Sequence, residues 1–250
     1  MSVPISGLTL SVLAGLATGV GGLLITVFGK VDKKILSFAT GVASGMMLAV
    51  SFLSLLADAL ELVSLMTVIL GFLIGFFVLF ILDIMIPHIH ITLKGEGVVV
   101  DKELLRRSAV IALGVAMHNI PEGMAVALTY THKESLGILV ALTIGIHNVP
   151  EGAITAIPLT EMGFSKLKVF LITLLSGITE PLFAFLTFLL FSGAKLAVLG
   201  FNSAFAAAAM IYITVDELIP EAYSTGHGHS VSLGLIFGIV LSLYLLKLLT

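Results

Sequence analysis

The hexapeptide His-Asn-Ile-Pro-Glu-Gly at residues 118–123 occurs a second time as His-Asn-Val-Pro-Glu-Gly at residues 147–152. Both copies lie inside apolar stretches that are long enough to span a membrane. A charged side chain at the centre of a bilayer costs roughly 2.5–3.5 kcal/mol on insertion scales, so such residues are rare there and mark functional sites. Two imidazoles and two carboxylates, repeated in this way, predict a metal site held by membrane-spanning helices.

The composition excludes a water-soluble protein. Of the 250 residues, 58% are hydrophobic and 11% are charged, whereas a soluble domain carries about 25% charged residues. The net charge of −3 and the scattered basic residues offer no surface for nucleic acid. Cysteine is absent, which excludes disulfides, thiolate ligands and thiol catalysis. We predict an all-α polytopic protein in the lipid bilayer, with one transmembrane domain over residues 1–250.

Eight segments reach the roughly 20 mostly apolar residues that a spanning helix needs. They are residues 5–28, 35–57, 64–87, 108–130, 135–158, 166–191, 197–219 and 231–249. The first segment is too long for the apolar part of a signal peptide and follows no charged region, so we expect it to be retained. The connections are short and leave no room for a soluble domain.

The basic residues predict the orientation of the helices. Three of the twelve lie in even-numbered connections or at the C-terminus: Lys133, Lys195 and Lys247. The others lie in odd-numbered connections: Lys30, Lys33, Lys34, Lys94, Lys102, Arg106, Arg107, Lys166 and Lys168. Short loops rich in Lys and Arg face the cytoplasm, so both termini are expected outside.

A weak internal repeat relates the second and seventh predicted helices. Residues 47–59 align without gaps to residues 210–222. Because one of these helices runs outward and the other inward, the two copies have inverted topology. Inverted repeats around a midplane site are typical of transporters. We therefore predict that helices 1–3 and 6–8 are inverted repeats around a central pair of helices 4 and 5.

The two hexapeptides are expected to meet near the middle of the membrane. Ser108 lies ten residues before His118, about 15 Å along a helix. Ser135 lies twelve residues before His147, about 18 Å from the opposite face. Since the hydrocarbon core is roughly 30 Å thick, both motifs reach its midplane.

Each hexapeptide supplies three candidate metal ligands. Its His and Glu are four residues apart and share a helix face, and its Asn lies about 100° round the helix. The proline cannot donate a backbone hydrogen bond and is expected to kink the helix, while the glycine lets another helix come close. Nitrogen and oxygen ligands suit zinc, ferrous iron, manganese or cobalt. The candidate ligands are His118, Asn119, Glu122, His147, Asn148 and Glu151.

Further acids lie in helices 6 and 7. Glu180 is near mid-depth and precedes a proline, while Asp216 and Glu217 lie towards the cytoplasmic end, before Glu221. No lysine or arginine lies at the centre of any predicted helix. These acids must therefore be protonated or paired with a cation.

Each of these residues, taken alone, also has an ordinary structural interpretation. An intramembrane His commonly forms a hydrogen bond between helices, and a Glu beside proline can be a protonated side chain at a kink. We interpret Asp58 and Glu61 as a solvated outer rim that could attract cations, and Asp83 as interfacial. The histidines at 88–90 and 227–229 are interpreted as solvated loop residues.

With these residues in view, the chain resembles the Zrt/Irt-like (ZIP) family of divalent metal transporters over essentially its whole length. The resemblance rests on the two hexapeptides, on Glu-Pro at residues 180–181 and on Asp-Glu-X-X-Pro-Glu at residues 216–221. It is strongest to prokaryotic members that carry the hexapeptide in both helices. Many relatives have a long His-rich loop between helices 3 and 4, whereas this loop has only His88 and His90.

The resemblance implies a two-metal centre. One ion would be held by His118, Glu122, His147 and Glu151. The second would be held by Asn119, Asn148 and Glu180, with Glu122 and Glu151 bridging. From their positions along the helices, we further expect Asp58 and Glu61 to concentrate cations outside, and Asp216, Glu217 and Glu221 to pass the ion inward.

The function that follows is uptake of zinc and related divalent cations (iron, manganese, cobalt, cadmium) into the cytoplasm across a prokaryotic inner membrane. The metal is cargo, and no prosthetic group is expected. An exporter with the same ligands and a membrane-embedded metalloenzyme are the alternatives. The sequence lacks the His-Glu-X-X-His motif, and the two prolines suit a moving gate, so we predict a transporter and not an enzyme. Assembly as a homodimer is left open.

Overall fold

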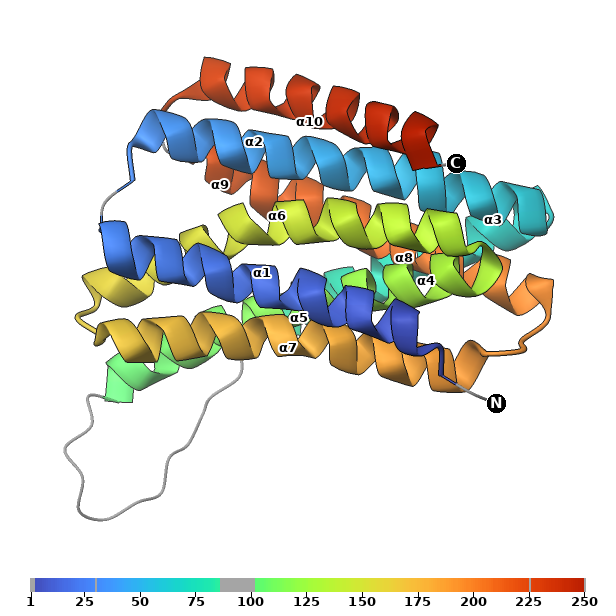
Figure 1. The fold of residues 1–250 in the computed structure, drawn as a ribbon, viewed down its shortest axis with the longest axis horizontal. Helices are drawn as coiled ribbons and strands as arrows, with labels where there is room; N and C mark the ends of the chain where they lie inside the picture. The colour runs from blue at the N-terminus through green and yellow to red at the C-terminus, as the bar shows by residue number, and fades with distance from the viewer. Residues whose placement is uncertain (1–2, 30, 86–101, 225, 250) are drawn as a thin grey trace, which may run out of the picture.

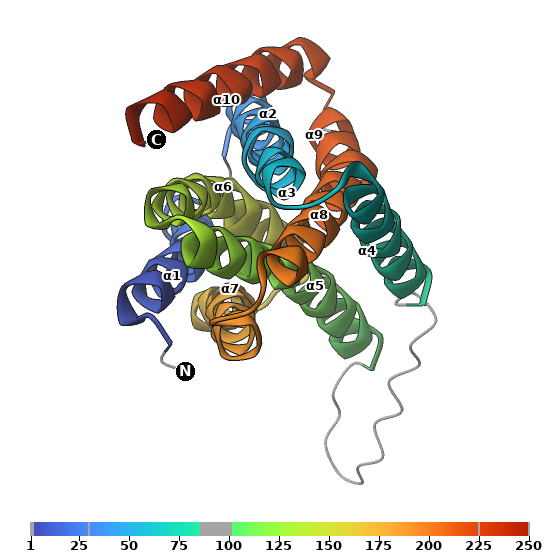
Figure 2. The same cartoon turned by 90° about the vertical axis from the view of Figure 1, so that its right-hand side faces the viewer.

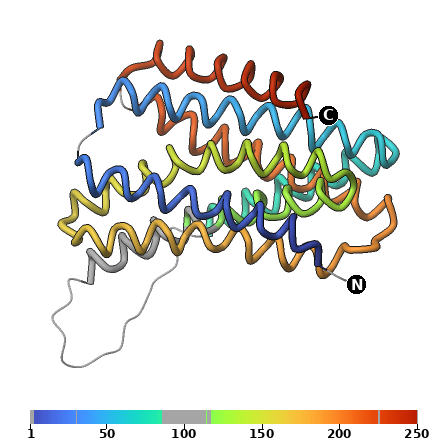
Figure 3. Tube along the Cα trace, viewed as in Figure 1, coloured from blue at the N-terminus to red at the C-terminus, as the bar shows by residue number. Residues whose placement is uncertain are grey.

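The computed structural model describes residues 3–29, 31–85, 102–224 and 226–249, with the backbone alone for residues 102–113, 115 and 116. Within these ranges the chain is a bundle of long helices without any strand (Figures 1 and 3). Large apolar side chains point outward, as on α4 (Leu65–Met85), where Leu73 and Phe77 are exposed. Such a surface is stable only in lipid, and the prediction of an all-α membrane protein is confirmed.

Most predicted spans agree with single helices. These are α1 (Ile5–Phe28), α4, α5 (Lys102–His132), α6 (Glu134–Glu161), α7 (Lys166–Phe191) and α10 (Gly228–Leu249). The predictions of 5–28 and 166–191 match the helix ends. The predicted histidines at 88–90 lie outside the described residues. Seven of the described helical spans are long and apolar enough to cross a membrane, and α5, with 31 residues, contains the predicted span 108–130.

Two spans are longer than predicted and change helix type midway. The first consists of α2 (Lys33–Val50), the π-helical η1 (Ser51–Leu56) and α3 (Ala57–Leu62). The second consists of α8 (Leu196–Ile213), the π-helical η3 (Thr214–Leu218) and α9 (Ile219–Ser224). The predictions of 35–57 and 197–219 ended too early, because the apolar pattern stops before the helix does.

The two π-helical segments begin in the same way. The Ser51 hydroxyl donates to the Met47 carbonyl at 2.8 Å, and the Thr214 hydroxyl donates to the Met210 carbonyl at 2.7 Å. Side-chain hydrogen bonds of this kind compete with the regular helical ladder and bend helices. π-helical turns inside α-helices occur frequently at functional sites.

The helices pack in matching pairs. The pair of α1 and α6 matches the pair of α7 and α5. The pair of α2 and α10 matches the pair of α8 and α4. Seen end-on, α10 and α4 lie at the periphery, while α5 and α6 cross the middle of the bundle (Figure 2). Both termini lie at the same end of the molecule (Figure 1). α5 and α6 continue through Pro121 and Pro150, so these prolines do not end either helix.

Candidate metal centre

Three side chains from the two hexapeptides meet in the interior between α5 and α6. The Nε2 atom of His147 lies 3.1 Å from Oε1 of Glu122 and 3.4 Å from Oε2 of Glu151. One ligand atom from each residue lies within 4.8 Å of the others. Ligand atoms bound to one tetrahedral zinc ion at about 2.0–2.2 Å are separated by about 3.3–3.6 Å. The three residues are therefore spaced as ligands of a single ion.

The polar atoms of this cluster have no hydrogen-bond partner. Both carboxylate oxygens of Glu122 and Glu151, and both ring nitrogens of His147, are buried and unsatisfied. Buried polar groups in native structures are nearly always hydrogen-bonded, and buried charges are paired or bind metals. The cluster therefore has the ligand atoms of a cation site, and a bound cation would stabilise its buried carboxylates.

Each asparagine turns its amide nitrogen to the backbone of a neighbouring helix. Asn119 donates to the Ser176 carbonyl at 2.7 Å, and Asn148 donates to the Ala14 carbonyl at 2.9 Å. The Oδ1 atoms of both asparagines are buried without a partner. The amide oxygens are thus fixed and available as neutral ligands.

Glu180 is fully buried on α7 and is held by two donors. Ser11 donates to Oε1 at 3.1 Å, and Asn148 donates to Oε2 at 2.9 Å. The second of these bonds ties Glu180 to the hexapeptide of α6. The structure therefore brings Glu180 next to one of the predicted ligands, Asn148.

Two glycines let the helices of the centre approach neighbouring backbones. A Cβ atom on Gly123 would collide with the Glu180 carbonyl of α7, and one on Gly152 would collide with the Thr18 carbonyl of α1. The prediction that these glycines permit close helix packing is confirmed. This packing places α7 and α1 against the two hexapeptides.

Comparisons with known proteins identify the family of the chain. A family model described as ZIP zinc transporter matches residues 94–246. The zinc transporter ZupT of Corynebacterium glutamicum is 39% identical over 250 residues, which cover 93% of this chain and 94% of the relative. Zinc transporters ZupT of Chlorobaculum parvum and of an Enterobacter species are each 36% identical, and the latter alignment covers 99% of this chain and 98% of the relative. The chain belongs to the ZIP zinc transporter family. It is a multi-pass membrane transporter of zinc and not an enzyme.

In this ZIP protein His118 lies outside the three-residue cluster and contacts an acid from another helix. Its Nδ1–H donates to the Gly114 carbonyl at 2.8 Å, and its Nε2 lies 3.3 Å from Oε2 of Glu217 in η3. The backbone bond fixes the ring, so Nε2 is the nitrogen available for a cation. His118 and Glu122 share a helix face as predicted, but His118 is paired with an acid from another helix, 99 positions later in the chain.

The remaining predicted acids lie towards the opposite end from the termini. Glu217 is half-buried, whereas Asp216 and Glu221 are exposed. Asp83 accepts a hydrogen bond from the Tyr212 hydroxyl at 2.9 Å, which links α4 to α8. This bond gives Asp83 a specific structural partner that its interfacial position did not predict.

The interpretation of Asp58 as a solvated rim residue is wrong. Asp58 is buried on α3, and its Oδ1 contacts the Nδ1 atom of His132 at the end of α5. Glu61 is exposed, as predicted. The sequence analysis missed His132 because it lies 74 positions from its partner and outside both hexapeptides.

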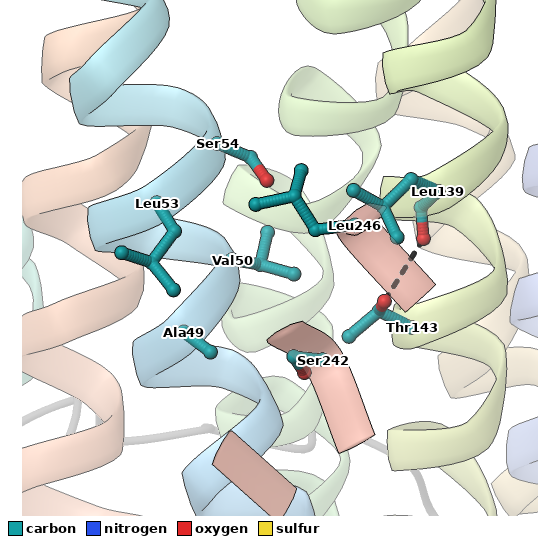
Figure 4. A pocket seen from close by; sticks show the side chains of 8 residues that line it. All are labelled: Ala49, Val50, Leu53, Ser54, Leu139, Thr143, Ser242 and Leu246. Carbon is teal, nitrogen blue, oxygen red and sulfur yellow. Dashed lines mark hydrogen bonds between the residues drawn. The ribbon is translucent and has the colours of Figure 1, made fainter. Parts of the chain in front are cut away.

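Two cavities lack the chemistry of a metal site. One, of about 10 Å³, lies between α2, α6 and α10 and presents the hydroxyls of Ser54, Thr143 and Ser242 without a carboxylate or imidazole (Figure 4). Thr143 donates to the Leu139 carbonyl, so one of these hydroxyls is already engaged. The other, of about 580 Å³, is an open groove between α1 and α6 lined by apolar side chains. The metal centre is therefore best assigned to the buried His and Glu residues.

Proposed function

We propose that the protein takes up zinc into the cytoplasm through a centre built on Glu122, His147 and Glu151. The observation that carries this proposal is the set of buried, unpartnered ligand atoms of the three residues at tetrahedral spacing. A mixed imidazole and carboxylate site without thiolates binds the ion while still allowing its release. His118 completes the first site from the side of Glu217.

The second site of the centre is proposed between the asparagines and Glu180. The free Oδ1 atoms of Asn119 and Asn148 supply neutral oxygens, and the Glu180 carboxylate adds charge. Glu122 and Glu151 bridge the two ions. The carboxylates of such a cluster repel one another, and bound divalent cations offset this repulsion.

The fold is proposed to consist of eight transmembrane helices in one domain over residues 1–250, with inverted repeats. Symmetric contacts support the repeat. In the first hexapeptide, Asn119 donates a hydrogen bond to α7 and Gly123 packs against α7. In the second, Asn148 and Gly152 make the same two contacts with α1. The π-helical segments η1 and η3 start at aligned positions of the repeat identified in residues 47–59 and 210–222. An inverted repeat around the α5–α6 pair explains why these contacts come in pairs.

The path is proposed to run from the end that holds both termini to the opposite end. Both termini are then outside, in a bacterial cytoplasmic membrane. Glu217 lies next to His118 and would receive the ion from the centre, and Asp216 and Glu221 would pass it to the cytoplasm. Iron, manganese, cobalt and cadmium are further proposed substrates because nitrogen and oxygen ligands accept them. Assembly as a homodimer stays a prediction.

Metal flux into proteoliposomes of known protein orientation tests this function. We expect zinc to move from the side of the termini to the opposite side, and a panel of divalent cations to compete with it. Flux only in the reverse direction would identify an exporter. Absence of zinc flux in either direction, by protein that binds zinc, would contradict the proposal.

A further inference from the structure

A further imidazole–carboxylate pair joins the end of α5 to α3, a helix at the same end of the bundle as both termini (Figure 1). His132 is the last residue of α5, and its Nδ1 contacts Oδ1 of Asp58 in α3. Asp58 is 5% exposed, and its other oxygen, Oδ2, is buried without a hydrogen-bond partner. The His132 side chain is 25% exposed. A buried carboxylate with one oxygen that lacks a hydrogen bond therefore contacts an imidazole that solvent can reach.

We infer that Asp58 and His132 form an outer binding site for the transported divalent cation, distinct from the central cluster. Imidazole nitrogen and carboxylate oxygen are ordinary zinc ligands. The unpartnered Oδ2 atom gives Asp58 a ligand position that the contact with His132 does not use. Glu61, exposed three residues further along α3, adds negative charge beside the site. This inference rests on the proposed uptake of zinc.

The two-residue site is suited to transient capture. The cation replaces the proton between the imidazole and the carboxylate, this proton is released to the solvent that reaches His132, and water fills the other coordination positions of the cation. Such a site binds more weakly than the three-residue centre, so the ion can move on. His132 is ten residues beyond Glu122, about 15 Å along α5. One ion cannot bridge this distance, so the two sites bind separate ions.

The competing explanation is a structural contact that only ties α3 to α5. In that case removal of His132 would lower stability and leave metal binding unchanged. Metal binding therefore distinguishes the two explanations, whereas loss of transport alone does not.

Zinc titration of purified protein tests the inference in a background without the centre, Glu122→Ala with His147→Ala. We expect this protein to bind one zinc ion per chain with reduced affinity. Adding His132→Gln should weaken that binding at least about tenfold, by comparison with the effect of losing a group that only supports a metal ligand. Asp58→Asn should act in the same way. Glu134→Gln is the matched control, because Glu134 is exposed at the same end of the bundle and bonds to Tyr130 instead.

Zinc binding that is equal with and without His132→Gln would overturn the outer site, as would no binding at all in the background protein. If the background protein binds as many ions as wild type, the central assignment fails while the effect of His132→Gln still judges the outer site. A measurement on the wild-type chain covers variants that do not fold. Zinc should slow the reaction of His132 with diethyl pyrocarbonate, followed by mass spectrometry, and an unchanged rate would contradict the inference.

Discussion

Glu122 is a buried acid at the centre of the bundle. Neither of its oxygens accepts a hydrogen bond, and Oε1 lies 3.1 Å from His147 Nε2. A lone ionised carboxylate in such surroundings costs several kcal/mol. The site is therefore stable only when a proton or a cation occupies it. A divalent cation also offsets the second carboxylate, Glu151, and this explains why both acids are tolerated at the centre of the bundle.

We expect Glu122→Ala, and likewise His147→Ala, to reduce zinc uptake at least about tenfold, because each removes a proposed direct ligand. Loss of a residue that only supports a metal ligand already lowers metal affinity or activity about tenfold or more. Expression and helical content should stay close to wild type, since the removed groups make no hydrogen bond in the protein. Radiolabelled zinc uptake by proteoliposomes measures the effect. Glu134→Gln, which removes an exposed acid at the start of α6, is the control and should transport normally. Normal uptake by Glu122→Ala would refute the central assignment.

Glu180→Gln is expected to have a milder effect, confined to the second ion. The substituted amide keeps one acceptor oxygen but must direct its NH₂ group at Ser11 or Asn148, both of which donate to Glu180. Asn148 would then reorient and lose its fixed oxygen. Bound zinc in purified protein should fall from two ions towards one, while partial transport remains. Equal zinc content in variant and wild type, with unchanged competition by cadmium, would show that Glu180 has only a structural role.

Sequence spacing predicted the residue contacts that are local. His147 and Glu151 lie four apart on one helix, and the depth argument placed Glu122 opposite them. Contacts between distant helices could not be predicted in this way. The pairing of His118 with Glu217 joins α5 to η3, and the pairing of His132 with Asp58 joins α5 to α3. Neither is encoded in a local pattern.

At the scale of single elements, helix approach determines whether the centre can form. α5 packs on α7 at Gly123, and α6 packs on α1 at Gly152, where in each case a Cβ atom would collide with a backbone carbonyl. Helix spans could be predicted from apolar length, but the π-helical segments could not. They depend on hydroxyl groups that bond back to the preceding turn, and the same hydroxyls occur elsewhere in ordinary α-helix, as at Thr155.

Gly123→Ala and Gly152→Ala are expected to destabilise the protein by about 1–3 kcal/mol each, because overpacking forces the neighbouring backbone to shift. Both should also reduce transport, since the shift moves α7 or α1 away from the asparagines. Thermal unfolding in detergent measures the loss. Gly145→Ala on α6 is the matched control: its Cβ would lie 3.5 Å from Ala14, an ordinary contact, and alanine is favoured over glycine in helices by roughly 1 kcal/mol. Equal stability of Gly152→Ala and Gly145→Ala would contradict the role of close packing.

At the scale of the whole molecule, the paired contacts give the bundle two similar halves around α5 and α6. The halves are not equivalent in chemistry. The end with both termini has the buried Asp58 with His132, whereas the opposite end has Asp216, Glu221 and Glu217, the last of which contacts His118. An ion crossing the centre therefore meets a small, partly buried site on one side and a more open acidic group on the other. The orientation of the bundle in the membrane then determines which of these two ends faces the cytoplasm.

The orientation can be tested directly because the chain has no cysteine. Single substitutions Glu61→Cys and Glu161→Cys introduce one thiol each at exposed positions at opposite ends of the bundle. With both termini outside, a membrane-impermeant maleimide should label Glu61→Cys in intact cells. Glu161→Cys should react only after permeabilisation, because α6 runs from the outer end at Glu134 to the cytoplasmic end at Glu161. The cysteine-free chain is the control for background labelling. The opposite pattern would place the termini inside and reverse the proposed path, and labelling of both variants in intact cells would show that Glu161 does not face the cytoplasm.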